Sequence, residues 1–550
     1  MLRPLLRFIG IYFFALAVAC ALVKREYSLH PSPEGEVIAS VWKDGILIER
    51  VVVADKSVRD ARIEKALAES KGELVFETVI ADSPVLKWTE LVLGISFVPG
   101  RDGLRARVGD TTTYLTPDDL LSRQLYDHGL HIQTLSLALG LDTAGLAQLL
   151  SERLKTNPEQ VLETASLRRI RVERHTSSER PRITADNLNR DEVKEAIVAG
   201  ARYLARGVSN QGRFRYTVQA PANRELPGYD WPRHAGATYF LAQVAGLTHD
   251  PLLADACRRA ASLLRGGALS SCGGLPCVGD EPVVALGSSA LALLAFAEIV
   301  ERNIDPGYRA IVIDMARFVR SQQRPDGEFM HDYDRRAGRP IDRQGLYYSS
   351  EATLALARAY PITQDPADLD GAVRGLRHLV GPAWSFFGDR YYFGEEHWTC
   401  QAIAALWPYA PDAKALDFCL RWQAFGRKLQ QREGDSYFDA DGAIGVGPVV
   451  TPRLTPVASR CEAAVATLDV ARRSGVSAEE LAVLDAQLRR ALALLVRQQF
   501  RPGLRHLFKS PADVHGAMPG SEVDWELRID YTQHAGSAMV RWLEVIAGGA

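Results

Sequence analysis

The sequence predicts a mainly α-helical protein in which residues 190–550 form a closed double ring of twelve helices, an (α/α)6 toroid. A small α+β domain at residues 36–175 and an N-terminal membrane anchor precede the ring. Three observations predict this order: an apolar run near the N-terminus, then alternating apolar runs separated by turn residues, then charged helices that alternate with charge-poor ones.

The composition is that of an ordinary globular protein. Of the 550 residues, 47% are hydrophobic and 24% are charged, and the formal net charge is -2. A chain of this length buries a large core in two or more domains. The near-zero net charge does not favour nucleic acid, so we expect no nucleic-acid partner.

Residues 1–27 are predicted to be a signal anchor or signal peptide. An apolar run from Phe8 to Val23 follows the basic segment "MLRPLLR". Its length falls between a signal-peptide core and a full membrane span. Ala17 to Ala19 fits a cleavage site and Cys20 fits a lipoprotein signal, but the apolar run continues past Cys20, which favours an uncleaved anchor. We expect anchoring in a bacterial inner membrane with the bulk of the chain periplasmic or extracytoplasmic; a lipoprotein or a secreted protein is the alternative.

The seven cysteines are too scattered to predict a disulfide framework. Cys272 and Cys277 are a close pair in the Gly-rich stretch "SSCGGLPCVGD". A small disulfide or two free thiols are favoured over a metal, because no zinc-ligand spacing follows. We therefore predict neither a metal nor a cofactor.

The α+β domain is predicted from strand and turn patterns. Asp44-Gly45 lies between two apolar runs and indicates a β-hairpin. No catalytic motif is visible in this domain. The elements that follow are a helix at 57–70, a strand at 73–81, hairpins within 91–115, helices near 117–126 and 143–155, and a closing strand at 166–175.

The toroid is predicted from a strict alternation of two kinds of helix. Helices poor in charge and rich in Ala, Gly and Ser are expected to be buried on most sides, as an inner ring. They begin near residues 233, 287, 349, 397, 459 and 533. The amphipathic outer helices are expected at 190–206, 251–264, 307–323, 368–380, 413–430 and 478–499.

A repeated phrase indicates that the ring closes. Asp, an aromatic residue, two further residues and His-Ala-Gly occur from Asp230 to Gly236 and again from Asp530 to Gly536. In a closed ring the first and last inner helices are neighbours, so both copies lie at one mouth. The two aspartates then precede their helices, near free backbone N–H groups.

The stretch "ARFVRSQQRPDGEF" resembles the QW-type repeat of terpene cyclases, and "ARYLARGVSNQGRFRY" is a weaker copy. Residues 190–550 thus resemble the α/α-toroid families: six-hairpin glycosidases, uronyl epimerases and lyases, and the terpene-cyclase and prenyltransferase group. The resemblance implies the fold. The Asp-rich motif of squalene-hopene cyclases is absent, and Asp417-Phe418-Cys419, which matches part of a prenyltransferase zinc signature, falls on an expected outer helix.

Loops before the inner helices carry the candidate substrate-binding residues. Aromatic side chains can stack on sugar rings, and arginines can bind a uronic carboxylate or a phosphate through two hydrogen bonds. A binding site lined by aromatic and charged side chains suits a carbohydrate better than a purely apolar substrate. The candidates are Trp231, Arg233, Tyr348, Glu396, His397, Trp398, Arg460, Glu462, Arg528 and Tyr531.

Glycosidic cleavage needs a carboxylic acid and a carboxylate. In a six-membered ring the third inner helix faces the sixth, so Glu351 is expected to face Asp530 and His534, and His397 is expected to face His234. A histidine can act as base or orient a carboxylate. The alternative is that Asp230 and Asp530 are helix caps and that the two histidines lock the ring closure. The catalytic candidates are Asp230, His234, Glu351, Asp530 and His534.

The sequence therefore predicts an exported, membrane-anchored enzyme that hydrolyses, or modifies as a lyase or epimerase, a cell-envelope or extracellular polysaccharide. Its expected partners are a glycan, the membrane through residues 8–23 and, as a further candidate, envelope proteins. A non-catalytic glycan-binding or assembly scaffold is one alternative. An isoprenoid-handling enzyme with an apolar tunnel is the other.

Overall fold

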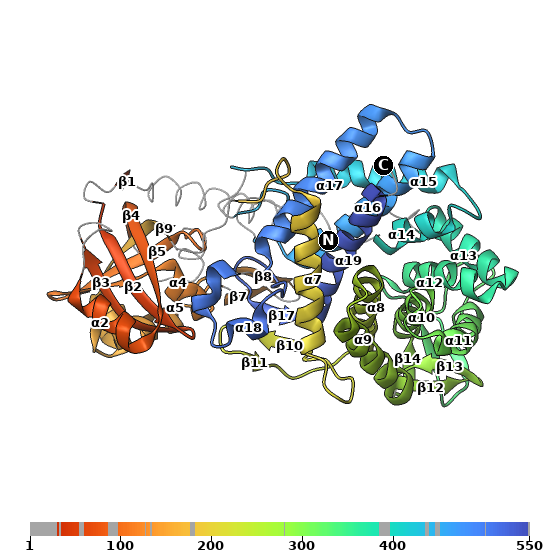
Figure 1. Cartoon of the computed structure of the whole chain (residues 1–550), viewed down its shortest axis with the longest axis horizontal. Coiled ribbons are helices and arrows are strands. Elements are labelled where there is room, and N and C mark those ends of the chain that lie inside the picture. Colours follow the sequence, from red (N-terminus) through yellow and green to blue (C-terminus); the bar gives the residue numbers. More distant parts are fainter. Residues whose placement is uncertain are drawn as a thin grey trace, which may run out of the picture.

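The computed structural model comprises a sheet-rich domain and a larger helical domain (Figure 1). It describes residues 35–53, 60–85, 97–126, 141–175, 182–279, 281–383, 397–434, 439–445, 451–500 and 504–547, and the backbone alone of 30–31, 128–132, 135–140 and 502–503. The expected anchor at 1–27 lies outside these ranges. Within them, no helix combines the length and apolar character that a membrane span requires.

The first domain is built on an antiparallel sheet in which the order of the strands differs from their order in the chain. Asp44 and Gly45 have φ values of 51° and 79° and form the expected hairpin turn between β2 and β3. The strand order is β3-β2-β4-β9-β5-β6, and β1 pairs with β4. The strands are β1 (His30–Pro31), β2 (Val37–Lys43), β3 (Ile46–Val53), β4 (Glu73–Val85), β5 (Asp102–Val108), β6 (Thr111–Leu115) and β9 (Ser166–His175).

Helices flank this sheet, and three of them follow the sequence prediction. These are α2 (Ala61–Ser70), which Asp60 caps, α4 (Pro117–Ser122) and α5 (Thr143–Leu154). The short helix α6 (Pro158–Thr164) and the hairpin of β7 (His128–Ile132) and β8 (Leu135–Gly140) were not predicted. The part of the expected hairpins that falls at 91–96 lies outside the described residues.

The helical domain is a double ring, as the alternation predicts. Consecutive inner helices contact one another, and the last, α19, contacts the first, α8. The inner helices are α8 (Trp231–Thr248), α10 (Leu286–Glu301), α12 (Tyr348–Thr363), α14 (His397–Leu406), α16 (Leu454–Arg473) and α19 (Ile529–Ala547). The outer helices are α7 (Arg190–Arg206), α9 (Pro251–Leu263), α11 (Arg309–Ser321), α13 (Pro366–Leu379), α15 (Ala413–Lys428) and α17 (Ala478–Gln498).

Small residues allow α8 and α19 to approach closely. A Cβ atom added to Gly536 would lie 2.2 Å from the ring of Phe240. The Ser537 hydroxyl donates a 2.9 Å hydrogen bond to Oε1 of Gln243. Glycine and serine at these positions therefore explain why the charge-poor helices can close the ring.

A short sheet joins the loops that precede these two helices. β10 (Thr217–Gln219) pairs antiparallel with β17 (Glu526–Arg528) and, on its other side, with β11 (Arg224–Glu225). This ladder holds the starts of α8 and α19 side by side. The two copies of the repeated phrase consequently lie at one mouth of the ring.

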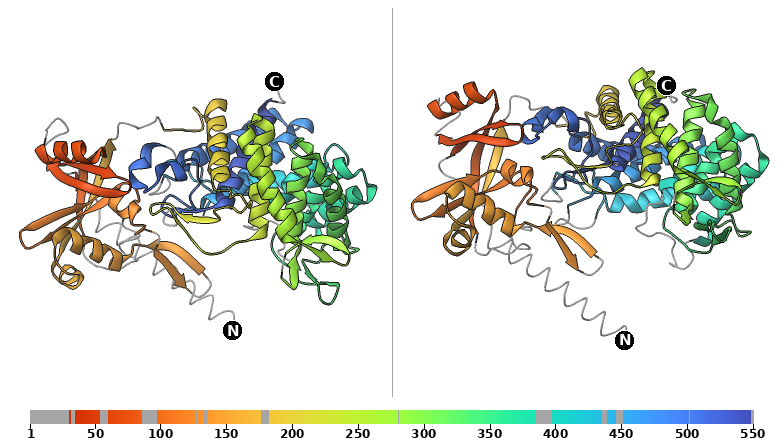
Figure 2. Two further views of the ribbon diagram at one scale, coloured as in Figure 1. Left: turned by 60° about the horizontal axis from the view of Figure 1, so that its bottom comes forward. Right: turned by 90° about the horizontal axis from the view of Figure 1, so that it is seen from below.

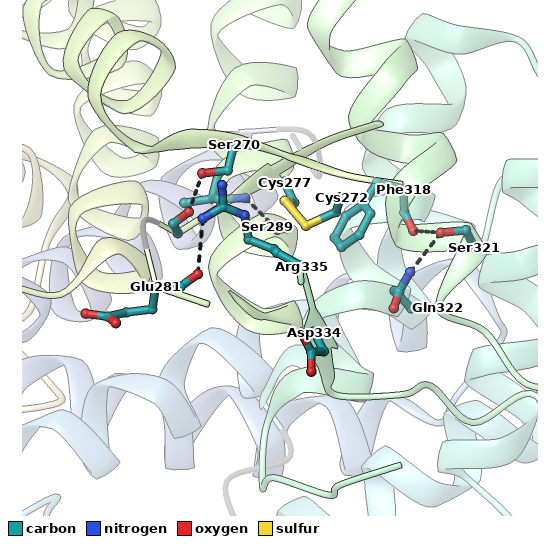
Figure 3. Close-up of a disulfide and its surroundings, with 12 residues drawn as sticks. Ser270, Cys272, Cys277, Glu281, Ser289, Phe318, Ser321, Gln322, Asp334 and Arg335 are labelled. Atoms are coloured by element: carbon teal, nitrogen blue, oxygen red, sulfur yellow. Dashed lines mark hydrogen bonds between the residues drawn. A yellow bond between two sulfur atoms is a disulfide. The ribbon is translucent and has the colours of Figure 1, made fainter. Parts of the chain in front are cut away.

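Other short elements complete the loops. The hairpin of β12 (Leu269–Cys272) and β13 (Leu275–Val278) contains a disulfide between Cys272 and Cys277, which is one of the two alternatives left open by the sequence (Figure 3). The Val278 amide donates to Oγ of Ser289 in α10, which fixes this hairpin to an inner helix. The remaining elements are a π-helical turn at Leu264–Ala268, β14 (Val283–Ala285), β15 (Asp332–Asp334), β16 (Arg339–Ile341), 3₁₀ turns at Pro306–Tyr308 and Pro502–Leu507, and α18 (Pro511–Val514).

A second disulfide, between Cys400 of α14 and Cys419 of α15, was not predicted. It ties an inner helix to its outer partner. Because Cys419 is in a disulfide, its thiolate is not available as a zinc ligand. The partial zinc signature around Asp417 therefore has no metal-binding cysteine.

The two domains lie at opposite ends of the long axis in all views (Figure 2) and touch through a buried pair. Nε2 of His506, in the 3₁₀ turn Pro502–Leu507, lies 2.7 Å from Oδ2 of Asp118 in α4. The Gly45 amide of the β2–β3 turn donates to the His506 carbonyl at 3.0 Å. Burial lowers the pKa of His506 to about 4, so the imidazole is neutral and donates to the aspartate.

Candidate active site

The N-terminal ends of the inner helices surround a cavity of about 520 Å³, called here the mouth cavity. All inner helices contribute to its wall. Ten expected site residues line it: Asp230, Arg233, Tyr348, Glu351, His397, Trp398, Arg528, Asp530, Tyr531 and His534. Pro232, Leu291, Tyr347, Arg453, Thr455, Pro456 and Gln533 complete the lining.

The two aspartates of the repeated phrase share arginines. Oδ2 of Asp230 lies 2.8 Å from Arg233, and Oδ2 of Asp530 lies 3.4 Å from Nε of the same arginine. Arg528 holds both oxygens of Asp530, at 2.6 and 2.8 Å. Asp230 also caps α8, as the alternative interpretation expects, whereas Asp530 lies inside the first turn of α19.

His534 lines the mouth cavity and contacts the buried carboxylate of Glu462, which lies behind it. Its Nδ1 lies 2.8 Å from Oε2 of Glu462, and Nε2 of His397 lies 3.9 Å from the same oxygen. The rings of His397 and His534 have centroids 5.4 Å apart. Burial raises the pKa of Glu462, and the charge of His534 opposes this rise. Three inner helices, α14, α16 and α19, thus place one carboxylate between two imidazoles.

These three residues are also the set of described ligands that could hold a metal ion, since their ligand atoms lie within 4.8 Å of one another. Two ligands of one tetrahedral zinc ion lie roughly 3.3 Å apart, given zinc–ligand distances of about 2.0 Å. The 2.8 Å contact between Glu462 and His534 is instead the length of a charge-assisted hydrogen bond. The geometry is that of a hydrogen-bonded pair.

Glu351 lies in the first turn of α12, opposite α19 in the order of the ring. Its side chain is buried, and burial together with the charge of Asp230 raises its pKa to about 8, while His534 acts in the opposite direction. The carboxyl group is therefore protonated at neutral pH. A buried protonated carboxyl group beside a ligand cavity can act as a general acid.

His234 occupies a different place from the one the sequence predicts. Its Nε2 donates to the Ala260 carbonyl of α9 at 2.9 Å, and its Nδ1 accepts from the Tyr229 hydroxyl at 2.6 Å. Burial lowers its pKa to about 4. The side chain thus points away from the mouth cavity, and His397 faces His534 rather than His234. This is the interior hydrogen-bonding role of the alternative interpretation.

Other expected residues also lie outside the lining. Trp231 forms T-shaped ring contacts with Tyr229 and His234. Arg460 is buried, donates to the Pro456 carbonyl and lies 5.7 Å from the ring of Trp422. Glu462 lies behind His534, and Glu396 falls outside the described residues.

Arg453 is a lining residue that was not among the candidates predicted from the sequence. It forms an ion pair with Asp524 at 2.6 Å and donates to the Tyr531 hydroxyl at 3.3 Å. Arg528 lies 4.6 Å above the Tyr531 ring. The signal for Arg453 is its position directly before α16, at the end of a Gly-rich loop.

Comparison with solved structures identifies the fold. A sugar epimerase from a ruminal bacterium superposes with a TM-score of 0.50 and 11% identity over 66% of this chain and 99% of that one. Cellobiose 2-epimerase from Bacillus thermoamylovorans B4167 gives 0.50 and 8% over 64% and 98%. An unsaturated glucuronyl hydrolase specific for heparin gives 0.46 and 12% over 65% and 99%.

No protein-family model matches the sequence, and no curated protein does. At identities this low the structural likeness is one of fold. The expected (α/α)6-toroid fold is confirmed, without a specific family.

Proposed function

We propose that the protein is a carbohydrate-active enzyme that binds a saccharide in the mouth cavity and acts on it by general acid–base catalysis. One observation carries the proposal: His534, which Glu462 contacts from behind, and Glu351, whose pKa is about 8, line the same cavity from opposite sides of the ring. A base and an acid are thereby available to a single bound molecule.

His534 is the proposed base. A hydrogen bond joins its Nδ1 to Oε2 of Glu462. When the proton of that bond lies on Nδ1, Nε2 is the basic nitrogen, and the carboxylate stabilises the imidazolium that forms when Nε2 takes up a second proton. Burial keeps water from weakening this interaction.

The paired imidazoles favour proton transfer at a carbon atom. Epimerisation next to a carbonyl requires one group to remove a proton and another to return one, and His397 and His534 lie 5.4 Å apart by ring centroid. Hydrolysis requires two carboxyl groups. In the mouth cavity Asp230 and Asp530 both form ion pairs with arginines. Glu351 is then the one carboxyl group, of these three, that is not paired with an arginine. The two superposed epimerases, at a TM-score of 0.50, support the same choice.

The second candidate is a glycoside hydrolase or lyase. The raised pKa of Glu351, about 8, suits the acid that protonates a leaving oxygen. Asp530 would then serve as the carboxylate. An isoprenoid substrate is disfavoured, since charged residues lie throughout the wall of the mouth cavity.

We place this enzyme outside the cytoplasm, anchored by residues 8–23, with an envelope or extracellular polysaccharide as substrate. The two disulfides support this placement because disulfides persist in oxidising compartments. The apolar N-terminal run supports the anchor.

The test is incubation of the purified protein with reducing oligosaccharides in D₂O, followed by NMR. Epimerisation incorporates deuterium beside the carbonyl, whereas hydrolysis releases new reducing ends without it. His534→Gln and His397→Gln should remove either activity. The matched control is His249→Asn, at the left-handed C-cap of α8, which asparagine tolerates. Saccharide binding without turnover in the wild-type protein would instead support a glycan-binding scaffold.

A further inference from the structure

A second cavity lies at the C-terminal ends of the inner helices, called here the rear cavity. Its volume is about 520 Å³, equal to that of the mouth cavity. Side chains from α8, α12, α14, α16 and α19 line it. It exists because α14 and α16 present alanines, Ala404, Ala405 and Ala466, where larger residues would fill the centre of the ring.

Glu462 lines the rear cavity and contacts His534, which lines the mouth cavity. One of its oxygens, Oε2, forms the contact with His534. Its other oxygen, Oε1, is buried and has no hydrogen-bond partner among the described residues. The residue is only 1% exposed. A buried acceptor without a partner costs about 1–3 kcal/mol, so a ligand that donates to it is favoured.

Gln401 supplies a matching donor. It lines the same cavity from α14, and its Nε2 is likewise buried without a hydrogen-bond partner within the described ranges. The wall of the rear cavity therefore contains one buried acceptor and one buried donor that no described protein group satisfies. A molecule with hydroxyl groups satisfies both, because each hydroxyl can donate and accept.

The lining of the rear cavity is rich in charged residues. Arg358, Arg472, Arg473 and Arg541 line it, together with the acidic residues Glu462, Asp469 and Glu544. Arg358 is bound to Glu298, and Arg473 is bound to Asp469 at 2.5 Å. Arg472 is exposed and donates to the Val545 carbonyl at 3.3 Å. Arg541 is paired with Glu544, so among the described residues Arg472 is the lining arginine without an ion pair, and its guanidinium group favours an anion beside it.

We propose that the rear cavity is a second ligand site, separate from the mouth cavity, for a small hydroxylated carboxylate of the size of a sugar acid. Its hydroxyl groups donate to Oε1 of Glu462 and accept from Nε2 of Gln401. Its carboxylate binds beside Arg472. The alanine walls accommodate the carbon skeleton. This site does not depend on the reaction proposed for the mouth cavity.

The experiment is calorimetric titration of the full-length protein with sodium D-glucuronate at pH 7 and low salt. Three variants localise the binding. Ala405→Phe fills the rear cavity, Arg472→Gln removes an exposed charge without disturbing the core, and Leu291→Phe narrows the mouth cavity instead. Neutral D-glucose is the control for the carboxylate.

We expect glucuronate to bind the wild-type protein, with affinity at least tenfold lower in Ala405→Phe and Arg472→Gln and unchanged in Leu291→Phe. Glucose should bind at least tenfold more weakly than glucuronate. Absence of heat with glucuronate would overturn the proposal, since the cavity then holds only water. Binding that Leu291→Phe removes and Ala405→Phe preserves would also overturn it.

Discussion

Nδ1 of His534 and Oε2 of Glu462 lie 2.8 Å apart although the residues are 72 positions apart in the sequence. The contact exists because α16 and α19 are neighbours in the inner ring. The contact joins the last inner helix, α19, to α16. The pair is therefore both a product of ring closure and the centre of the proposed chemistry.

Glu462→Gln should lower kcat by about 10²–10⁴-fold and leave KM nearly unchanged. Glutamine keeps the shape of the side chain and removes the charge that stabilises the imidazolium of His534. The effect is measured by steady-state kinetics on the oligosaccharide that the D₂O experiment identifies as a substrate. Glu480→Gln, in the first turn of the outer helix α17, is the matched control. Equal kcat values for both variants would contradict the role of Glu462.

Glu351 should impose an upper pH limit on activity. Its pKa of about 8 means that the acid form predominates below pH 8 and is lost above it. kcat should therefore fall about tenfold for each pH unit above 8. Glu351→Gln should abolish activity while the circular dichroism spectrum remains unchanged. A variant that retained wild-type activity would exclude Glu351 as acid or base.

The ring could be predicted from sequence because burial leaves a compositional signature. Helices that are surrounded by others carry few charges, and the start of every inner helix except α16 was predicted within a few residues of its position in the structure. α16 begins at Leu454, five residues before the expected 459, because "LTPVA" carries no charge that would mark the helix start.

Helix rotation could not be predicted. The two copies of the repeated phrase have identical spacing, but α8 begins at Trp231, after its aspartate, whereas α19 begins at Ile529, before its aspartate. His234 then points toward α9, and His534 points toward the centre. The pairing of Glu462 with His534 and the disulfide between Cys400 and Cys419 depend on the same rotations, which apolar periodicity alone does not fix.

The interdomain histidine should make stability pH-dependent. His506 has a pKa of about 4 in the folded protein, below its usual 6.5, because it is buried beside Arg174. Between these values the unfolded chain binds a proton that the native state does not, so stability falls as the pH drops from 6.5 to 4. The loss is about 2–4 kcal/mol. Thermal denaturation should show a weaker pH dependence in His506→Gln, which can still donate to Asp118.

The disulfide between Cys400 and Cys419 should stabilise the ring beside the site. It closes a loop with a sequence separation of 19, for which the chain-entropy estimate is about 3 kcal/mol. Cys400→Ser with Cys419→Ser should lower the free energy of unfolding by about that amount in urea denaturation. Reducing agent should destabilise the wild-type protein. Cys257→Ser, which removes a buried free thiol, is the control, and reducing agent should destabilise this variant as much as the wild-type protein. An unchanged midpoint in the double variant would show that the disulfide adds no stability.

Ring closure itself can be tested at Gly536. A Cβ atom there would lie 2.2 Å from the Phe240 ring, so Gly536→Ala should force α8 and α19 apart and cost about 1–3 kcal/mol. Gly266→Ala is the control, since no atom lies within 4 Å of an added Cβ at that glycine. Phe240→Leu also destabilises by leaving a cavity, yet it makes room for the new methyl group. In urea denaturation the double variant should be more stable than the sum of the single effects predicts. Additive effects would mean that the first and last inner helices do not pack against each other at this contact, and the mouth cavity would lose the ring that encloses it.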